Sequence, residues 1–333
     1  MLESSIMAAP DSGPSADILD LIIIGAGPAG LTAAQYGARS NLQVLVIEEL
    51  APGGQALNID VLENYPGIAP DKSGFDFSAD LHKQARDFGA QFLTDSVMAL
   101  SKAGELFTVS LGNGAARRAR AVIIATGAKH RTLGSPGEAE FYGRGVSYCA
   151  TCDGPFFKGK KIFVVGGGDA ACDEAQYLSR LSPHIVLIHR REKFRAQRAL
   201  ADRVLHNPNI EVRFNTRMLE IRGEKQVTSV VLETGPVGAP GERHEEDAAA
   251  VFVFTGTIPQ TAFLGDSAVR PGFDESGYII TDANMMTAVP GLFAAGDVRA
   301  TPFRQVVVAA GEGAVAAHSA VAYIDTLKGE AYR

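Results

Sequence analysis

The sequence predicts an α/β protein made of two similar three-layer units, each a mostly parallel sheet between two covering layers. Three observations indicate this class. An apolar strand, a glycine-rich turn and a helix follow one another over residues 18–39, and the same succession recurs over residues 161–179. Each succession later reaches an apolar run that ends in Thr-Gly, at Gly127 and at Gly256. A repeated order with a period this long predicts two copies of one fold rather than a solenoid.

Length and composition favour a globular protein with two domains. The 333 residues allow about two domains of ~150 residues each, and the apolar (46%) and charged (21%) fractions are those of a folded chain. The formal net charge of -7 argues against a nucleic-acid partner. Residues 1–17 lack Lys and Arg, so we expect a disordered tail without a targeting signal. The most apolar stretch, 21–31, is too short to span a bilayer; we expect a cytoplasmic protein without a membrane partner.

The first unit begins with a dinucleotide-binding signature. A strand over 18–24 and a helix over 31–39 flank a turn that consists of Gly25, Ala26, Gly27, Pro28, Ala29 and Gly30. The first glycine permits the tight bend, the second lets backbone approach a pyrophosphate, and the third lets the helix pack on the strand. A second strand, 43–47, ends at Glu48, where an acid would accept hydrogen bonds from a ribose. This context predicts a Rossmann-like nucleotide site in preference to a plain glycine-rich turn.

The remainder of the first unit is expected to contain loops and short strands. Gly and Pro mark loops at 51–55 and 63–67, and a helix is predicted over 75–88. Short strands with polar turns follow over 91–120, and a buried strand over 121–127 closes the unit.

The second unit repeats this order with one decisive difference. A strand over 161–165, a turn over 166–171 and a helix over 172–179 lead to the second strand, 184–189. In place of the acid, that strand ends in a basic cluster formed by His189, Arg190, Arg191, Arg195 and Arg198. Guanidinium groups match phosphate oxygens bidentately, so the cluster predicts a ribose 2′-phosphate. We assign NADPH to this unit and FAD to the first; the alternative is a solvated basic stretch that opens a helix.

The last third of the chain is expected to return to the first unit. A strand over 291–298 carries Asp297, and a helix of small residues over 306–323 could stabilise negative charge on a reduced flavin at its N-terminal end. The predicted organisation is therefore an FAD-binding domain over 18–129 and 258–333 and an inserted NADPH-binding domain over 130–257, with hinges near 127–137 and 255–260.

Cys149 and Cys152 form the chemically distinctive pair of the sequence. Their spacing can close a small disulfide ring, and Asp153 could pass a proton to a departing thiolate or merely cap the turn. Three cysteines do not make a secreted disulfide framework, which leaves redox chemistry or metal binding. A metal would need two further ligands, and Cys172 is alone in a predicted helix as a small buried hydrophobe, so we expect no metal site. Nucleotide signatures on both sides of the pair indicate a flavin-carrying disulfide reductase driven by NADPH.

These ordered motifs resemble a known family. Cys-Ala-Thr-Cys-Asp before Gly-Gly-Gly-Asp-x-Ala, together with His-Arg-Arg, Gly-Gly-Gln, Glu-Asn-Tyr-Pro-Gly and Ala-Ala-Gly-Asp-Val segments, is similar to the low-molecular-weight thioredoxin reductases of bacteria, fungi and plants. The resemblance covers Asp17 to Tyr323. It implies a homodimeric FAD enzyme that reduces thioredoxin with NADPH.

The resemblance also implies site residues. Flavin would contact the first glycine turn and Glu48, Gly54, Gln55, Asn64, Val97, Asp297, Arg304, Gln305 and Val306. NADPH would contact Gly166, Gly168, Asp169, Ala170, His189, Arg190, Arg191, Arg195 and Gly256. In the family, the residue that matches Cys152 faces the flavin, the one that matches Cys149 attacks the thioredoxin disulfide, and Asp153 matches the family's acid.

Three positions depart from the family pattern without removing a reacting group: Ala170 stands in place of Ser or Thr, Thr257 in place of His or Tyr, and Phe303 in place of Tyr. A reductase of another redoxin or small disulfide and a dithiol oxidase remain alternatives. Because the nicotinamide and the cysteine pair both need the flavin and belong to one inserted domain, we hypothesise that this domain rotates between two positions.

Overall fold

The computed structural model describes residues 18–59, 61–62, 64–69, 71–236, 240–265 and 267–330. The predicted tail, 1–17, and Glu63 of the predicted loop 63–67 lie outside the described residues. The chain divides into two compact units. The first comprises the chain up to Gly54, Ser78–Gly127 and the chain from Pro259 onward; the second comprises Gln55–Phe77 and Ala128–Ile258.

The predicted domain limits lie within two residues of the breaks at Gly127 and Ile258. In contrast, Gln55–Phe77, which we expected in the FAD-binding domain, groups with the second unit. Which nucleotide each unit binds stays a prediction.

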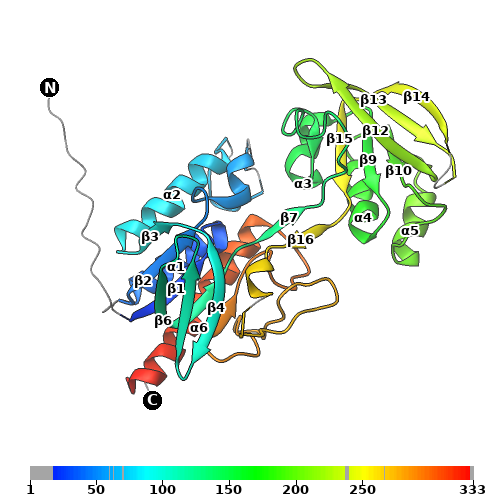
Figure 1. The fold of residues 1–333 in the computed structure, drawn as a ribbon. Coiled ribbons are helices and arrows are strands. Elements are labelled where there is room, and N and C mark those ends of the chain that lie inside the picture. The colour runs from blue at the N-terminus through cyan, green and yellow to red at the C-terminus, as the bar shows by residue number, and fades with distance from the viewer. Residues whose placement is uncertain are drawn as a thin grey trace. The chain divides into compact units, whose positions relative to one another are not determined.

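The first unit is built on a seven-stranded sheet (Figure 1). Four of its strands run parallel in the order β3-β2-β1-β6, with β17 also parallel to β6, and an antiparallel hairpin extends the sheet through β5 and β4. The strands are β1 (Leu19–Ile24), β2 (Val44–Glu48), β3 (Gln91–Thr94), β4 (Val97–Ala103), β5 (Leu106–Leu111), β6 (Ala116–Ile124) and β17 (Leu292–Ala294).

The two faces of this sheet bury separate cores. Leu21 and Ile23 of β1 lie in a cluster with residues of the flanking helices, whereas Ile22 and Ile24 lie in a second cluster with Phe107. Side chains of a strand alternate between faces, so a run such as Leu-Ile-Ile-Ile is apolar throughout when both faces are covered. The three-layer arrangement predicted for the unit is present.

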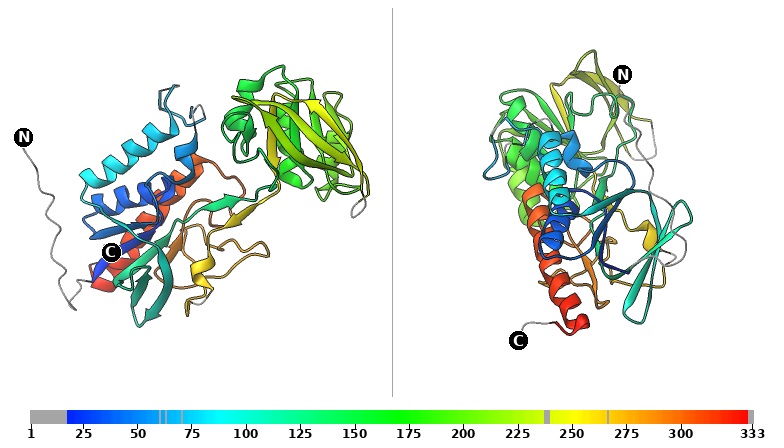
Figure 2. Two further views of the ribbon diagram at one scale, coloured as in Figure 1. Left: turned by 45° about the horizontal axis from the view of Figure 1, so that its top comes forward. Right: turned by 90° about the vertical axis from the view of Figure 1, so that its left-hand side faces the viewer.

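Helices cover one face of the sheet, and the other face is covered by the hairpin and by the segment that contains η3 (Ala262–Leu264). The helices of this region are α1 (Pro28–Arg39), α2 (Gly74–Asp87) and α6 (Val306–Lys328), and η1 (Gly54–Asn58) is a short 3-10 turn. Figure 2 shows α6, in red, alongside the blue α1. Their close approach requires glycine, because a Cβ at Gly313 would lie 2.1 Å from the carbonyl oxygen of Ala29.

By length and composition, α6 is the described helix that could cross a membrane. Its alanines Ala310, Ala316, Ala317 and Ala320 are buried, and three of them join the core cluster that also contains α1 residues. This is the packing of a helix in a protein core. The absence of a membrane partner stays a prediction.

The second unit contains a five-stranded parallel sheet in the order β11-β10-β9-β15-β8. One face packs on helices, and the other packs on the antiparallel sheet β12-β13-β14. The strands are β8 (Val146–Ser147), β9 (Ile162–Gly166), β10 (Ile185–Ile188), β11 (Ile210–Arg213), β12 (Thr216–Gly223), β13 (Val227–Thr234), β14 (Glu242–Asp247) and β15 (Ala250–Phe254). The helices are α3 (Ala150–Asp153), α4 (Asp169–Leu178) and α5 (Arg198–Leu205), with η2 (Gly154–Phe157) after α3. The predicted fold class, two Rossmann-like three-layer units, is confirmed.

Two short strands connect the units. β7 (Ala128–His130) pairs with β16 (Thr257–Pro259), and each follows a glycine with a positive φ, +69° at Gly127 and +104° at Gly256. Both glycines lie within the predicted hinge segments. The rotation of one unit against the other stays a hypothesis.

Candidate active site

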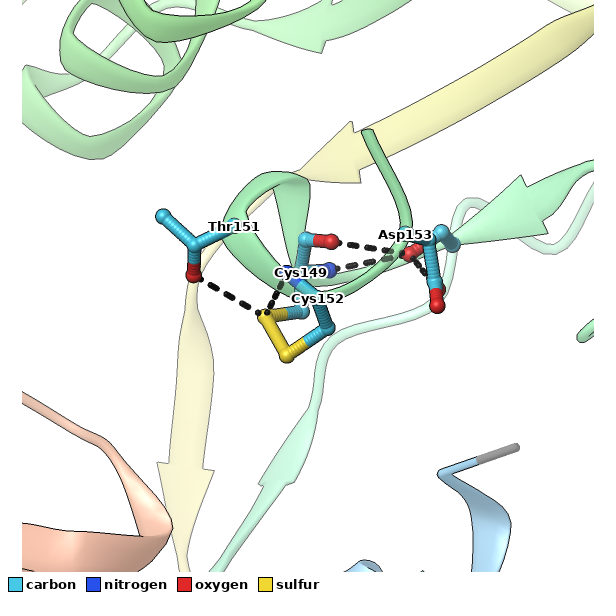
Figure 3. Close-up of a disulfide and its surroundings, with 5 residues drawn as sticks. Cys149, Thr151, Cys152 and Asp153 are labelled. Carbon is cyan, nitrogen blue, oxygen red and sulfur yellow. Dashed lines mark hydrogen bonds between the residues drawn. A yellow bond between two sulfur atoms is a disulfide. The ribbon is translucent and has the colours of Figure 1, made fainter. Parts of the chain in front are cut away.

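Cys149 and Cys152 form a disulfide at the start of α3 in the second unit (Figure 3). The turn brings their Cα atoms to 5.3 Å, and Cys149 is the N-cap residue of α3. The Cys149 sulfur accepts a hydrogen bond from the backbone N–H of Cys152 at 3.2 Å, and the Thr151 hydroxyl lies 3.4 Å from the same sulfur. After reduction these two groups would stabilise a thiolate on Cys149. The predicted pairing is therefore present.

Asp153 is held by Ser147 and lies away from the sulfurs. Its Oδ2 accepts a hydrogen bond from the Ser147 hydroxyl, and Figure 3 shows the side chain on the far side of the turn from the disulfide. Its backbone N–H donates to the Cys149 carbonyl at 3.1 Å. The proton-donor role of Asp153 stays a prediction.

A buried carboxylate supports the residue before the pair. Glu138, which is 4% exposed, accepts the hydroxyl of Tyr148 and the backbone N–H groups of Leu133 and Gly134, each at 2.8 Å. The Tyr148 ring stacks on His130 of β7 at 4.7 Å. Burial, and then the hydrogen bond to Glu138, raise the pKa of Tyr148 above its ordinary range, so the phenol stays protonated.

The two phenylalanines after the pair have different environments. Phe157 contacts the core residue Phe252 at 6.0 Å between ring centroids, whereas the side chain of Phe156 is 50% exposed. The sequence left both possibilities open for each of them. Of these two rings, Phe156 is the one that presents an aromatic surface to solvent.

The glycines of the first turn have the spatial roles that the signature predicts. A Cβ at Gly25 would lie 2.5 Å from the Ala125 carbonyl oxygen, and one at Gly30 would lie 1.9 Å from the Gly25 carbonyl oxygen. A Cβ at Gly27 would meet nothing within 4 Å. Gly27 therefore faces open space in which a phosphate could approach the backbone at the N-terminus of α1.

Glu48 lies at the predicted place beside this turn. Its carboxylate accepts the backbone N–H groups of Ala26 at 2.7 Å and Leu50 at 3.1 Å. Each carboxylate oxygen can accept more than one hydrogen bond, so the group keeps capacity for a ribose hydroxyl. Pro28 and Ala29 form the first turn of α1.

Asp297 and Arg304 follow β17 in the chain, and the Nε of Arg304 lacks a hydrogen-bond partner. Asp297 is partly buried, and its pKa is raised to about 6 by burial, against the lowering effect of Arg304 and with a contribution from Glu312. The Nε of Arg304 is buried and makes no hydrogen bond, and its guanidinium lies 4.2 Å from the centre of the Tyr278 ring. A buried donor without a partner and a destabilised carboxylate would both be satisfied by a polar ligand.

The remaining predicted flavin residues are more dispersed. Gln305 is the N-cap of α6, Val306 its first residue, and Val97 opens β4. A Cβ at Gly54 would lie 3.1 Å from Gly27 Cα, so Gly54 borders the glycine turn. Gln55 donates to the Ala128 carbonyl; Gln55 and Asn64 belong to the segment that groups with the second unit. Their contact with flavin stays a prediction.

Like the first, the second glycine turn contains a glycine with extended backbone that is the N-cap of a helix. Gly166 ends β9, Gly168 is the N-cap of α4, and a Cβ at Gly168 or at Gly256 would meet nothing within 4 Å. A Cβ at Gly167 would lie 2.2 Å from the ring of His189. The His189 ring is therefore packed on the turn.

His189 is 6% exposed, and its Nε2 has no hydrogen-bond partner. Burial, followed by the charge of Arg195, lowers its pKa, so the imidazole is neutral near pH 7. Like the Nε of Arg304, this buried nitrogen is a polar atom without a hydrogen-bond partner.

The predicted basic cluster lies against this turn. The Arg195 backbone N–H donates to the Gly167 carbonyl at 2.7 Å, and Asp169 accepts the backbone N–H of Gln197 at 2.7 Å. The side chains of Arg190, Arg191 and Arg195 are exposed, and among the described residues none of them has an ion pair. Arg198 in contrast pairs with Asp202 at 3.7 Å. Ala170, which departs from the family pattern, is exposed in the first turn of α4.

Several polar residues of these sites were not predicted. Glu312 of α6 accepts the Gly296 N–H at 2.8 Å and pairs with Arg299. Ser147 hydrogen-bonds Asp153, and Glu138 accepts a hydrogen bond from Tyr148. Glu312 could have been predicted from the sequence, because it is a charged residue inside an alanine-rich helix. Ser147 and Glu138 have no comparable sequence feature.

Metal binding finds no support among the residues that the structure describes, which contain no cluster of three or more His, Cys, Asp or Glu side chains. Cys172 is fully buried, and burial, with the charges of Asp169 and Asp173, raises the pKa of its thiol to about 11. It is an inert core residue.

Comparison with known proteins matches the chain to oxidoreductases that act on disulfides. The profile of the family described as pyridine nucleotide-disulphide oxidoreductase matches residues 19–313. The chain is 54% identical to a thioredoxin reductase of Treponema pallidum, over 93% of this chain and 98% of that protein. A thioredoxin reductase structure from Streptococcus pyogenes, 40% identical, superposes with a TM-score of 0.86 and covers 94% of this chain and 100% of that one. A Lactococcus lactis thioredoxin reductase described as in the FR conformation, 39% identical, covers 92% and 99% with a TM-score of 0.63.

Proposed function

This chain belongs to the pyridine nucleotide-disulphide oxidoreductase family, and we propose that it is an NADPH-dependent, FAD-containing thioredoxin-disulfide reductase. The observation that carries the proposal is the Cys149–Cys152 disulfide, with hydrogen-bond donors directed at the Cys149 sulfur, in a chain with two nucleotide-binding turns. The relatives named above are thioredoxin reductases.

The residues of the first unit fit FAD. Gly27 leaves room for a pyrophosphate, Glu48 has acceptor capacity for a ribose, and Arg304 and Asp297 offer a buried donor without a partner and a carboxyl group. Bound FAD would supply a two-electron relay between a nicotinamide and a disulfide.

The residues of the second unit fit NADPH. Gly168 leaves the N-terminal end of α4 open for a pyrophosphate. Arg190, Arg191 and Arg195 are exposed guanidinium groups, which suit a 2′-phosphate better than a bare ribose.

The cysteine pair would then act as follows. Two electrons break the Cys149–Cys152 bond, and one proton is taken up. One sulfur thereby becomes a thiol and the other a thiolate. The Cys149 thiolate attacks the disulfide of thioredoxin, and Cys152 resolves the mixed disulfide and releases the reduced dithiol. The balance is NADPH plus one proton plus disulfide to NADP⁺ plus dithiol. The exposed Phe156 offers an aromatic contact for the partner protein.

The test is NADPH oxidation by the purified, flavin-loaded protein with and without thioredoxin. Wild type should require thioredoxin for sustained turnover, and Cys152→Ser should abolish it. Arms with other redoxins and with small disulfides separate thioredoxin from the alternative substrates. A colourless protein, or thioredoxin reduction that survives loss of Cys152, would exclude the proposed function.

We propose a cytoplasmic homodimer, on the strength of the similarity to the thioredoxin reductases named above. Sedimentation of the holoprotein measures the oligomeric state directly.

A further inference from the structure

Ser147 hydrogen-bonds both to the backbone of Cys149 and to the carboxyl group of Asp153. It is the last residue of β8 and is 2% exposed. Its hydroxyl donates to Oδ2 of Asp153 and accepts the backbone N–H of Cys149 at 3.1 Å. The carbonyl oxygen of Cys149 lies 3.3 Å from the same hydroxyl and is a second acceptor for it.

We propose that Ser147 is a positioning residue that holds Asp153 in one place through a cycle of proton loss and uptake. The proposal rests on the proposed function and on the predicted role of Asp153 as the acid that releases a proton when the disulfide opens. Because its side chain is buried, Ser147 would act through Asp153.

The hydroxyl can satisfy the carboxyl group in both protonation states. When Asp153 is ionised, the Ser147 hydroxyl donates to it, as the structure shows. When Asp153 is protonated, its own O–H can donate to the Ser147 oxygen, and the Ser147 proton turns to the Cys149 carbonyl. The Cys149 N–H remains bonded to the Ser147 oxygen in both states. No heavy atom has to move.

The proton balance is explicit. Two electrons from NADPH open the disulfide, and Asp153 releases one proton, which reaches a sulfur through solvent because the carboxyl group lies away from the sulfurs. The products are one thiol, one thiolate and an Asp153 carboxylate. The carboxylate then takes a proton from solvent, and the Ser147 hydroxyl reverses its direction. Because the ionised form gains a charge-assisted hydrogen bond from Ser147, the serine also favours proton release.

Neighbouring titratable groups are few and identifiable. Tyr142 faces Asp153: burial, and then the charge of Asp153, raise the pKa of Tyr142. Tyr148 points to Glu138 and stacks on His130, whose pKa is lowered by burial. Tyr142→Phe is therefore the control that separates a tyrosine titration from that of Asp153.

The experiment titrates Asp153 in the full-length holoenzyme by carbon NMR of labelled Asp carboxyl groups, with Asp153→Asn to assign the signal. Ser147→Ala should move the titration of Asp153 upward by about one pH unit, because the ionised form loses a donor. The pH dependence of thioredoxin turnover should move by the same amount. Ser147→Cys keeps the size of the side chain with a weaker donor and should shift both readouts less.

In the Asp153→Asn background, Ser147→Ala should leave the pH dependence of turnover unchanged. An Asp153 titration that is identical in wild type, Ser147→Ala and Ser147→Cys would overturn the inference, as would an equal effect of Ser147→Ala with and without Asp153. If wild type fails to reduce thioredoxin while the NMR shift is present, the proposed function fails and the positioning role of Ser147 stands.

Discussion

Asp297 is a partly buried carboxyl group whose environment fits a polar ligand. Burial places its pKa at about 6, above the ordinary 3.8, although Arg304 opposes the shift. A protein rarely keeps a destabilised carboxyl group beside an unpaired buried guanidinium nitrogen unless a ligand uses them. The prediction at this residue concerns the flavin-free protein.

Because the folded-state pKa of Asp297 is raised, folding favours the protonated form, and its stabilising effect is present at low pH and lost as pH rises. The free energy of unfolding of flavin-free wild type, relative to Asp297→Asn, should therefore fall as pH rises from 3.8 through about 6. The total change should be on the order of 2–3 kcal/mol. Urea unfolding at several pH values measures it, and parallel curves for the two proteins would contradict the prediction.

The arginines beside the second glycine turn carry a prediction on nucleotide preference. Arg190→Ala with Arg191→Ala should raise the KM for NADPH about tenfold or more, because charge-assisted hydrogen bonds to the 2′-phosphate are lost. The KM for NADH and the kcat should change little. Arg198→Ala is the matched control, since Arg198 is engaged with Asp202. Equal losses with both nucleotides would show that these arginines do not read the phosphate.

At the scale of elements, the contact between α1 and α6 depends on backbone approach. The carbonyl of Ala29 lies where a side chain at Gly313 would begin, and Ala29 is part of the glycine turn. Displacement of α6 would therefore also displace the turn and the polar groups at the start of α6.

Gly313→Ala should destabilise the protein by about 2 kcal/mol or more and weaken flavin retention, because the new Cβ forces the helix backbones apart. Gly311→Ala on the same helix is the control: its Cβ meets nothing within 4 Å, so the change should be neutral or stabilising by up to about 1 kcal/mol. Thermal unfolding and flavin absorbance measure both. Equal stability of the two variants would contradict the close-packing account.

At the level of the whole molecule, each unit has hydrophobic clusters of its own. Both clusters of the second unit consist of residues between Leu133 and Phe254. The glycine turn, the basic cluster and the cysteine pair of this unit all lie in the same continuous stretch.

Residues 130–257 expressed alone should therefore fold, remain colourless and bind 2′,5′-ADP, and Arg190→Ala with Arg191→Ala should weaken that binding. Cooperative unfolding and calorimetric titration test these points. Since Gln55–Phe77 groups with this unit, a fragment linked to that segment is the second form to measure. Folding without nucleotide binding would contradict the assignment of NADPH to this unit.

Residue patterns alone predict the duplicated fold, the two glycine turns, the acid at Glu48 and the cysteine pair. These features are local: periodicity, turn chemistry and short spacings are read within a few residues, and the structure places them as predicted. The hydrogen-bond partners of Ser147, Glu138 and Glu312 and the different environments of Phe156 and Phe157 became known only from the three-dimensional structure. Such contacts depend on which backbone groups a side chain meets after packing, and one polar residue among many carries no mark of that in the sequence.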